Sequence, residues 1–283
     1  MTRLPSRVAT SLTGLVMPTR VFGWAEGLHN RSEYLVARNA VVAHGVDAGW
    51  FRILTAETNF AASRAVDAYL GGAGADEPSR EIVAAAWSWH PAPLRDNAKL
   101  LRWLRARNRR REDGARIRFY GLDMFGDQHH PNPPVSDEAD RAAVAALARR
   151  LSRHRAAGGD HRDLTVRGAA QYAVLREVAR RHPGERLLVF AQTEHLDPAR
   201  PASLGKRLAR GALGTYTAVG AVWDPDDPTA RYPLGRYAAL AQHAAQTTSM
   251  ALPGGAVFCA PTPAGAPFPA VVHASRLHAA PEL

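Results

Sequence analysis

The stretch RVFGWAEGLHNRSEYLVARNAVVAH, residues 20–44, indicates a buried strand that runs directly into a helix. Residues 20–25 form a short apolar run, typical of a strand covered on both faces, and residues 30–44 carry apolar side chains at helical spacing. The same order returns at once, because the apolar run FRILTA at 51–56 precedes a helical pattern at 60–70. Repeated strand–helix pairs of this length predict an α/β fold.

The alternation continues along the rest of the chain. Further strands are expected at residues 117–122, 186–191, 216–222, 256–259 and 269–273. Further helices are expected at residues 79–89, 94–108, 137–154, 165–181 and 234–246. The sequence therefore predicts a mainly parallel central sheet flanked by helices. We expect residues 1–283 to form a single domain, with a proline-rich hinge at 125–136 and a small helical lid within 125–185.

Composition excludes several classes of protein. The chain has 283 residues, of which 46% are apolar and 22% charged, so it can bury a core and is not a disordered chain. No apolar run reaches the roughly 18 residues of a membrane span. The single cysteine, Cys259, excludes an internal disulfide framework. The apolar patch at 12–17 is too short for a signal-peptide core, so we expect a cytoplasmic protein without membrane contact.

The formal net charge of +10 raises the question of nucleic-acid binding. Lys99 and Lys206 are the only lysines, so nearly all of the positive charge is arginine. The basic runs at 102–111 and 149–155 fall on predicted helices, whose solvated faces explain them, and no aromatic residues interleave with them as in RNA-binding modules. We therefore expect a small-molecule substrate and no nucleic-acid partner.

Acidic, amide and imidazole side chains follow four of the predicted strands. Ligands of parallel α/β sheets bind at the carboxyl ends of the strands. The side chains that follow the strands there are Glu26, His29, Glu57, Asp123, Gln192, Glu194 and His195. The sequence therefore predicts a functional site at this edge of the sheet.

His29 is the candidate base of that site. It lies on a strand-to-helix turn three residues after Glu26, and the dipole of the following helix favours a neutral ring there. A carboxylate such as that of Glu26 orients the ring and stabilises the cation formed when the ring takes a proton. The alternative is an ordinary loop histidine. Glu33 completes a capping-box pattern over residues 30–33 and is expected to cap the helix.

Three further charged residues are candidates for the site. Glu57 either points into it or caps the following helix together with Asn59. Asp123 either binds substrate or holds a neighbouring turn through hydrogen bonds. Arg38 lies among small residues of its helix, so we expect it to be partly buried, and a buried arginine needs a carboxylate.

Several established motifs are missing from the sequence. It has no GxSxG elbow, no P-loop and no GxGxxG opening a helix after a strand. Glu26, His29, Glu57 and His195 include ligand types that a divalent ion accepts, but their spacing is not that of the helical HExxH arrangement. We therefore predict neither a metal site nor a cofactor.

Several short segments occur in a fixed order along nearly the whole chain. They are AEGLHN (25–30), Arg38, FRILTAE (51–57), AVDAY (65–69), WLR with Asn108 (103–108), FYGLDM (119–124), and AVVH with Arg276 (270–276). In this order they resemble the erythromycin esterase family. The resemblance implies hydrolysis of an ester or macrolactone without a covalent intermediate and without a metal. It implies that His29 deprotonates a water, that Glu26 and Glu57 orient the water and stabilise the imidazolium, and that Arg38 holds the carboxylates or meets the oxyanion.

The sequence departs from the family at a later strand end. Where the family has a histidine-asparagine-x-histidine motif, this chain has QTEH at 192–195, so Gln192 replaces the first histidine. Glutamine donates a hydrogen bond but does not transfer a proton at neutral pH. We expect His195 to contribute to catalysis, and Gln192, Glu194 and Asp123 to bind substrate. The span 123–192 is shorter than the family's lid region, which implies a different pocket.

Two other functions fit the same residues. One is a natural-product tailoring enzyme that uses His29 for dehydration, cyclisation or lactone rearrangement, which the replacement at Gln192 favours. The other is a non-catalytic ligand-binding protein, in which the acidic and imidazole groups only recognise a ligand. The mass of the product separates hydrolysis from the first alternative, because hydrolysis adds one water.

Overall fold

The computed structural model describes residues 1–87, 93–123, 149, 153, 164–228, 234–247 and 249–283. The strands within them are β1 Val21–Glu26, β2 Ile53–Asn59, β3 Arg118–Asp123, β4 Leu187–Gln192, β5 Tyr216–Trp223, β6 Met250–Ala251, β7 Val257–Cys259 and β8 Ala270–Ala274. They form one sheet in the order β3-β2-β4-β1-β5-β8-β7-β6. Neighbours from β3 to β8 are parallel, whereas β7 and β6 pair antiparallel at one edge. The α/β class with a mainly parallel sheet is therefore confirmed.

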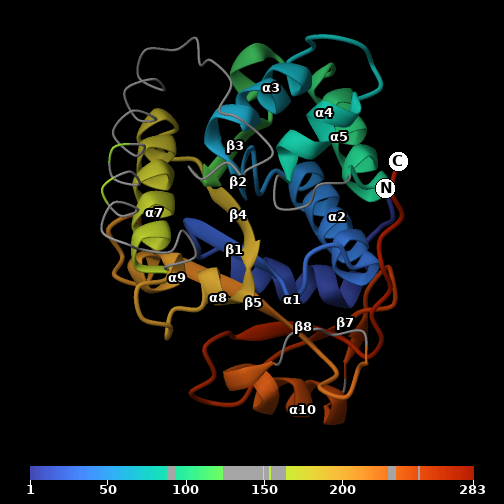
Figure 1. The fold of residues 1–283 in the computed structure, drawn as a ribbon, viewed down its shortest axis with the longest axis vertical. Coiled ribbons are helices and arrows are strands. Elements are labelled where there is room, and N and C mark those ends of the chain that lie inside the picture. The colour runs from blue at the N-terminus through green and yellow to red at the C-terminus, as the bar shows by residue number, and fades with distance from the viewer. Residues whose placement is uncertain (88–92, 124–148, 150–152, 154–163, 229–233, 248) are drawn as a thin grey trace.

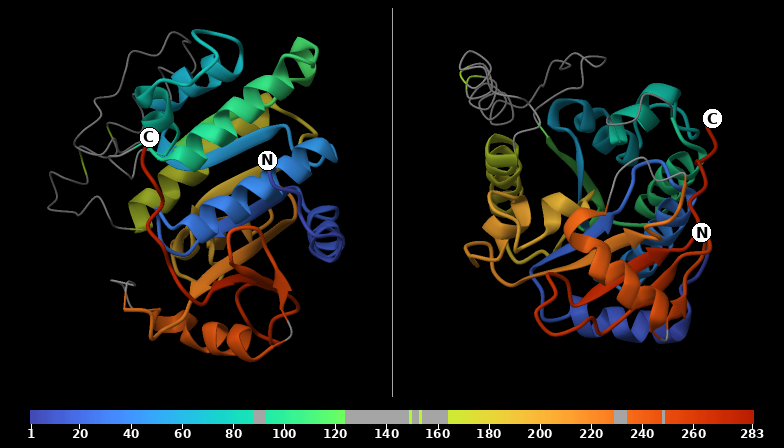
Figure 2. Two further views of the ribbon diagram at one scale, coloured as in Figure 1. Left: turned by 90° about the vertical axis from the view of Figure 1, so that its right-hand side faces the viewer. Right: turned by 60° about the horizontal axis from the view of Figure 1, so that its bottom comes forward.

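Helices cover both faces of this sheet. Their bounds are α1 Ser6–Val16, α2 Ser32–Asp47, α3 Phe60–Leu70, α4 Arg80–Ala86, α5 Arg95–Asn108, α7 Leu164–Arg181, α8 Thr193–Leu196, α9 Leu204–Leu208 and α10 Ala238–Gln246, with 3-10 turns at Asp113–Ala115 and Gly235–Tyr237. α2 and α5 lie together on one side of the sheet, and α7 and α9 lie together on the other (Figures 1 and 2). The right-handed crossovers of parallel strands place helices on both faces in this way.

The predicted strands are all present within three residues of their expected bounds. The elements that were not predicted are the two-residue strand β6, the helix α1, the short helices α8 and α9, and the 3-10 turn at Asp113–Ala115. The apolar patch at 12–17 is the end of α1, which buries Val8, Leu12 and Val16 at a spacing of four residues and so is an amphipathic helix. The helix expected at 137–154 and the hinge at 125–136 lie outside the described residues.

The described part of the expected lid belongs to the main core. α7 forms the end of the range 125–185, and its Ala170, Val174, Leu175 and Val178 are buried in the same hydrophobic cluster as the strands. The apolar runs of β1 and β4 are buried on both faces, as a doubly covered strand requires. α7 is therefore a layer of the α/β fold, and residues 125–148, 150–152 and 154–163 of the lid range lie outside the described residues.

The carboxyl ends of four adjacent strands meet at one edge of the sheet. Glu26 at the end of β1 lies opposite Gln192 at the end of β4. Asn59 at the end of β2 lies opposite Asp123 at the end of β3. The order β3-β2-β4-β1 therefore brings together residues that are up to about 170 positions apart in the sequence, as expected for the ligand-binding edge of such a sheet.

The start of α2 differs from the predicted capping box. Arg31 is the N-cap residue, and no side chain caps the helix. The buried carboxylate of Glu33 instead accepts hydrogen bonds from the backbone N–H (3.2 Å) and ring Nδ1 (2.6 Å) of His278. Glu33 thus ties the C-terminal segment to α2, a long-range contact that the local pattern does not contain. The predicted role of Asn59 is confirmed, because its side chain accepts a hydrogen bond from Ala62 N at the start of α3.

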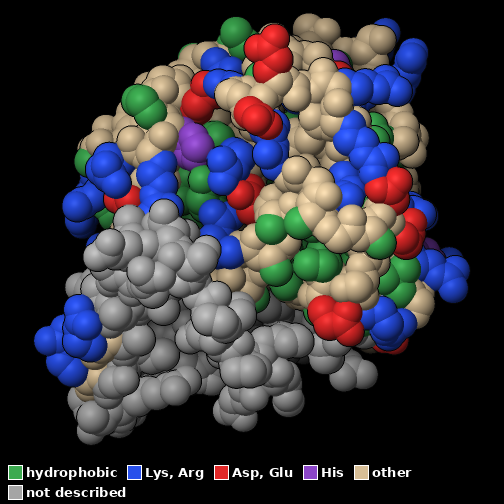
Figure 3. All heavy atoms as spheres, turned by 90° about the horizontal axis from the view of Figure 1, so that it is seen from above, with side chains coloured by type: hydrophobic (Ala, Val, Ile, Leu, Met, Phe, Trp, Pro, Cys, Tyr) green, Lys and Arg blue, Asp and Glu red, His purple; other side chains and the backbone are tan. Residues whose placement is uncertain are grey.

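Three arginines of the basic run at 102–111 form ion pairs on the surface. Arg102 pairs with Glu77, Arg107 with Asp47, and Arg109 with Asp76. Lys and Arg side chains on the face seen in Figure 3 are likewise interspersed with Asp and Glu. The basic run is therefore a charged helix face with acidic neighbours. Among the described helices, none combines the length and the apolar character that crossing a bilayer requires.

Candidate active site

A histidine, a glutamate and an arginine form the first part of the site. The side chain of Glu26, at the end of β1, is 6% exposed. His29 Nδ1 lies 3.1 Å from Glu26 Oε2, and Arg38 Nη1 donates to Glu26 Oε1 at 2.9 Å. The turn between them depends on Gly27, where a Cβ atom would lie 2.9 Å from Tyr34 Oη. The strand end, the tight turn and α2 therefore fix the three side chains relative to one another.

Arg38 is held from every side by polar and aromatic groups. Its Nε and Nη2 donate to Asn39 Oδ1 at 3.2 and 3.0 Å, and its Nη2 also donates to Asn97 Oδ1 at 2.6 Å. Its guanidinium carbon lies 4.4 Å from the ring centre of Trp87. Arg38 is completely buried, and the expectation that it pairs with a carboxylate is confirmed. Because its nitrogens are taken by these partners, Arg38 positions Glu26 and does not reach an oxyanion, the other role that the resemblance implied.

A second histidine, glutamate and arginine lie across the site. Glu57, near the end of β2, accepts a hydrogen bond at Oε2 from the backbone N–H of Gln192 at 2.7 Å. Its Oε1 lies 2.5 Å from Arg167 Nη2 and 3.2 Å from His195 Nε2. All three side chains are more than nine-tenths buried. Of the two interpretations of Glu57, the structure shows a residue of the site and not a helix cap.

Arg167 and Gln171 of α7 also lie in the site, although no sequence pattern points to them. Arg167 donates to both oxygens of Asp123, from Nε at 3.1 Å and from Nη2 at 2.7 Å. Gln171 Nε2 lies 3.2 Å from Asp123 Oδ1. Asp123 has no exposed surface, so its carboxylate holds Arg167 in place and offers no direct contact to a substrate. The sequence does indicate that a cation is needed, because the two carboxylates of Glu57 and Asp123 lie at one edge of the sheet. No local pattern identifies Arg167 as that cation.

The charges of the site keep both glutamates ionised. Burial alone raises the pKa of Glu26, but the hydrogen bond with His29 and the charge of Arg38 outweigh it, and the pKa lies below its usual range. Burial also raises the pKa of Glu57, but the neighbouring His195 and Arg167 outweigh it and hold the pKa well below its usual range. Each carboxylate is therefore an anion at neutral pH.

The negative charges of the two glutamates raise the pKa of His29, whereas the dipole of the following helix would lower it. Burial disfavours the cation, but the hydrogen bond to Glu26 and the charge of Glu57 outweigh it, so the pKa of His29 is raised. The direction of this shift is therefore opposite to the one expected from the dipole of α2. α2 begins at Ser32, three residues beyond His29, whereas Glu26 contacts the ring directly.

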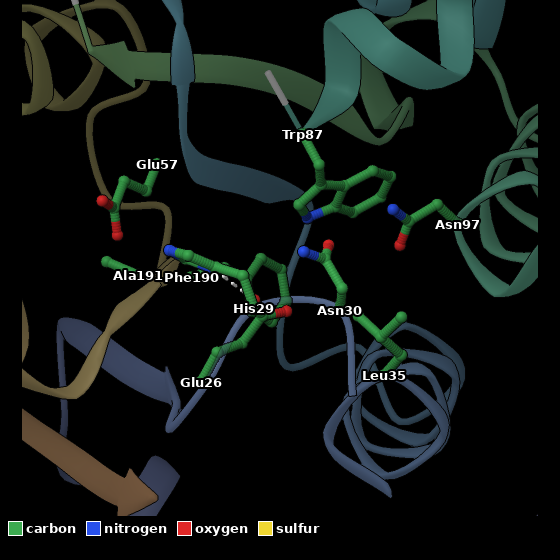
Figure 4. Close-up of a pocket in the computed structure, with 9 residues that line it drawn as sticks. All are labelled: Glu26, His29, Asn30, Leu35, Glu57, Trp87, Asn97, Phe190 and Ala191. Carbon is green, nitrogen blue, oxygen red and sulfur yellow. Dashed lines mark hydrogen bonds and ion pairs between the residues drawn. The ribbon is translucent and has the colours of Figure 1, made fainter. Parts of the chain in front are cut away.

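Both glutamates and His29 line one pocket. Figure 4 shows Glu57 on one side, Trp87 and Asn97 on another, and His29 between Glu57 and Asn30. The His29 side chain is 29% exposed, and its Nδ1 faces Glu26. The volume open to the centre of a water molecule is about 20 Å³, which is enough to hold one. The pocket thus brings a histidine and two anionic carboxylates to a space in which a water fits.

The chain resembles known proteins in sequence over part of its length and in fold over nearly all of it. The family model for erythromycin esterase matches residues 46–150, a range that contains Glu57 and Asp123. A histidine-to-asparagine variant of the erythromycin esterase EreC, in its open conformation, superposes over 99% of this chain and 96% of its own, with a TM-score of 0.65 and 13% identity. The chain is similar to erythromycin esterases in sequence over residues 46–150 and in fold over nearly its whole length.

Other solved structures share the fold at similar identity. A protein from Bacillus cereus matches with a TM-score of 0.59 and 12% identity, over 98% of this chain and 93% of its own. A succinoglycan biosynthesis protein matches with a TM-score of 0.57 and 12% identity, over 96% of this chain and 92% of its own. The erythromycin esterase-like scaffold therefore occurs in proteins with different descriptions.

Several residues of the erythromycin esterase-like segments have structural roles. Asp67 accepts from the backbone N–H of Phe119 at 2.8 Å and pairs with Arg118. Arg105 donates to backbone carbonyls of the loop after α3, and Asn108 bonds both the N–H and the C=O of Ile117. These residues hold the strand ends and loops in place. The segments that carry the resemblance therefore include residues of the scaffold as well as residues of the site.

The structure separates the three residues expected to bind substrate. The side chain of Glu194 is 44% exposed and pairs with Arg200 at 2.9 Å. Gln192 is partly buried, and its backbone, through the N–H to Glu57, is what joins it to the site. Asp123 lies behind Arg167. Direct substrate contact therefore does not fit Asp123, and Glu194 belongs to a surface ion pair.

The charged groups do not form a metal-binding set. Among the described residues, no group of three or more His, Cys, Asp and Glu has the geometry to hold a metal ion. Glu26 and Glu57 are instead each bound by a guanidinium, from Arg38 and Arg167. A divalent cation at either carboxylate would therefore be repelled by the guanidinium that is already bound to that carboxylate.

Proposed function

We propose that this chain hydrolyses an ester or a lactone of a small molecule, with His29 as the base that activates water. The observation that carries the proposal is the His29–Glu26–Arg38 arrangement at the edge of a pocket. Glu26 is ionised, so the hydrogen bond at 3.1 Å requires the proton to lie on His29 Nδ1. Nε2 of the neutral ring then carries the lone pair that accepts a proton.

The reaction uses His29 twice. Nε2 takes a proton from water, and the oxygen of that water adds to the carbonyl carbon of the substrate, whose π electron pair moves to the carbonyl oxygen. When the tetrahedral intermediate collapses, the bond to the leaving alkoxide breaks and the imidazolium returns the proton to that alkoxide. Atoms and charges balance with one water consumed and no covalent bond to the protein. These reaction steps need no second acid, so a glutamine at position 192 is compatible with them.

The two glutamates have different tasks in this proposal. Glu26 fixes the tautomer of His29 and stabilises the imidazolium through a direct hydrogen bond. Glu57 does not contact His29 in the described geometry, but its charge raises the pKa of that ring, so it stabilises the same cation through space. Arg167, His195 and the Gln192 N–H hold Glu57 ionised and fixed.

A turnover screen tests the proposal. Macrolides, smaller lactones and aryl esters are incubated with the wild type, His29→Ala and His243→Ala, each with and without a chelator, and the products are weighed by mass spectrometry. His243 lies on α10, where its ring contacts Thr247, so it is a matched histidine outside the site. The expected product is heavier by one water, disappears with His29→Ala, and survives both the chelator and His243→Ala.

The other outcomes of the screen decide between the alternatives. Full activity of His29→Ala would contradict the proposal. A product of unchanged mass or lighter by one water would indicate the tailoring reaction, in which a hydroxyl of the substrate replaces water as the nucleophile or leaves. Tight binding of an intact ligand without turnover would indicate a binding protein, and loss of activity with the chelator would indicate a metal.

A further inference from the structure

Trp87 places an unused hydrogen-bond donor beside the site. It follows α4 as the C-cap residue and lines the same pocket as His29 and Glu57. Its indole Nε1 is buried and has no hydrogen-bond partner among the described residues. Buried polar groups are normally paired, so an orphaned donor in a pocket is a candidate for contact with a ligand. Figure 4 shows the indole nitrogen on the side of the ring that faces Asn30 and His29.

The ring of Trp87 is held in place by two neighbours. The Arg38 guanidinium carbon lies 4.4 Å from the centre of the ring, and Phe119 packs against it edge-on at 6.0 Å. Arg38 also binds the carboxylate that orients His29. Trp87 is thus fixed relative to His29 through two intervening side chains, Arg38 and Glu26, and such preorganisation is what a transition-state donor needs.

The cations of the site do not supply this donor through their described contacts. Arg38 donates from Nε, Nη1 and Nη2 to Asn39, Glu26 and Asn97. Arg167 directs Nε and Nη2 to Asp123 and Glu57. The charge that develops on the carbonyl oxygen during ester hydrolysis nevertheless needs a donor in the pocket.

We infer that the indole N–H of Trp87 donates a hydrogen bond to the carbonyl oxygen of the substrate and stabilises the oxyanion of the tetrahedral intermediate. The inference rests on the proposed hydrolysis. In the step concerned, the water oxygen bonds to the carbonyl carbon, the π pair moves to the carbonyl oxygen, and the water proton goes to His29 Nε2. The indole proton stays on its nitrogen throughout, so Trp87 acts only by hydrogen bonding.

The variant Trp87→Phe tests the donor while keeping an aromatic ring between Arg38 and Phe119. With the ester or lactone found by the turnover screen, kcat is expected to fall about 10²- to 10³-fold, with little change in KM. The acid limb of the pH–rate profile is expected to stay in place, because the contact of His29 with Glu26 is untouched. Trp103→Phe is the matched control, since Trp103 also packs under an arginine, Arg107 at 4.9 Å, away from Glu26 and His29.

A second measurement does not depend on turnover. The chain has six tryptophans, so ¹⁵N-labelling of the indoles gives six N–H signals, and the one missing from Trp87→Phe is that of Trp87. An alkyl phosphonate monoester, whose anionic oxygens imitate the oxyanion, is the probe. We expect this signal to move downfield when the probe binds, and Trp87→Phe to bind the probe more weakly by about the factor lost in kcat.

Three results would overturn the inference. One is full kcat in Trp87→Phe. Another is a fall in kcat with unchanged affinity for the phosphonate, which would mean that the ring only supports the fold of the site. The third is an indole signal that does not respond to the bound probe. If the wild type hydrolyses its substrate, His29→Ala is inactive and Trp87→Phe is fully active, the proposed function stands and only the role of Trp87 fails.

Discussion

The two halves of the site repeat one arrangement with one difference. In each, a buried glutamate is bound by one arginine and one histidine: Glu26 by Arg38 and His29, and Glu57 by Arg167 and His195. The difference is access, because the side chain of His29 is 29% exposed and lines the pocket, whereas that of His195 is 3% exposed. In the proposed mechanism, the same three residue types give a base where the ring lines the pocket and a support for the glutamate where it does not.

The largest expected effect separates the two histidines. His29→Ala removes the base and is expected to lower kcat about 10²- to 10⁴-fold, the usual contribution of general acid–base catalysis. His195→Ala leaves the base in place and is expected to act mainly on stability, because it removes a partner of the buried Glu57. Turnover and urea unfolding of both variants measure the contrast. Equal losses of kcat with intact folds would mean that access does not distinguish the two rings.

The next largest expected effect is the loss of stability when either of the two arginines is replaced. Arg38→Met leaves the buried Glu26 without its cation and is expected to cost about 3–5 kcal/mol of unfolding free energy. Arg167→Met removes the cation of both Glu57 and Asp123 and is expected to cost at least as much. Urea unfolding checks both values. Adding Glu26→Gln to Arg38→Met should restore part of the stability, and no recovery would argue against an ion pair as the cause.

A smaller effect is the pH dependence of stability, which has opposite signs for the two residue types. The folded pKa of each glutamate lies below its unfolded value near 4.3, so their contribution is present above that pH and is lost as the pH falls. The folded pKa of His29 is raised, so its contribution is present below about pH 6.5 and is lost as the pH rises through the folded pKa. Melting temperatures across pH check this. Glu57→Gln should flatten the acid side and His29→Asn the alkaline side.

The smallest expected effect on stability and catalysis is that of replacing Glu194, which the sequence predicted to bind substrate. Its pair with Arg200 is on the surface, so Glu194→Gln is expected to change stability by no more than about 1 kcal/mol and to leave KM unchanged. Michaelis–Menten kinetics with the substrate from the screen measure this. A several-fold rise in KM would place Glu194 in the substrate site after all.

The half of the site on β1 and α2 was predictable because its parts lie close in the sequence. Glu26, His29 and Arg38 fall within one strand–turn–helix unit, and a buried arginine implies a carboxylate partner. The sheet edge was also predictable, since the apolar runs place the strand ends and the parallel topology brings them together.

The other half depends on contacts that no local pattern contains. Arg167 reaches Asp123 and Glu57 across 44 and 110 positions of the sequence. Its helix, α7, is an ordinary amphipathic element, so periodicity does not distinguish this arginine from the others on it. The role of Glu33 was mispredicted for the same reason. Its local sequence resembles a capping box, but its partner, His278, is 245 positions away.

The pH–rate profile of the wild type and of Glu26→Gln is the most direct test of His29 as a base. His29 must be neutral to accept a proton, and its pKa is raised by Glu26 and Glu57, so the rate should rise with pH through a midpoint above the usual histidine value near 6.5. Removing the charge and the strong hydrogen bond of Glu26 should lower kcat and move that midpoint to lower pH. A midpoint that stays where it is in Glu26→Gln would contradict the account, because the titrating base would then not be His29.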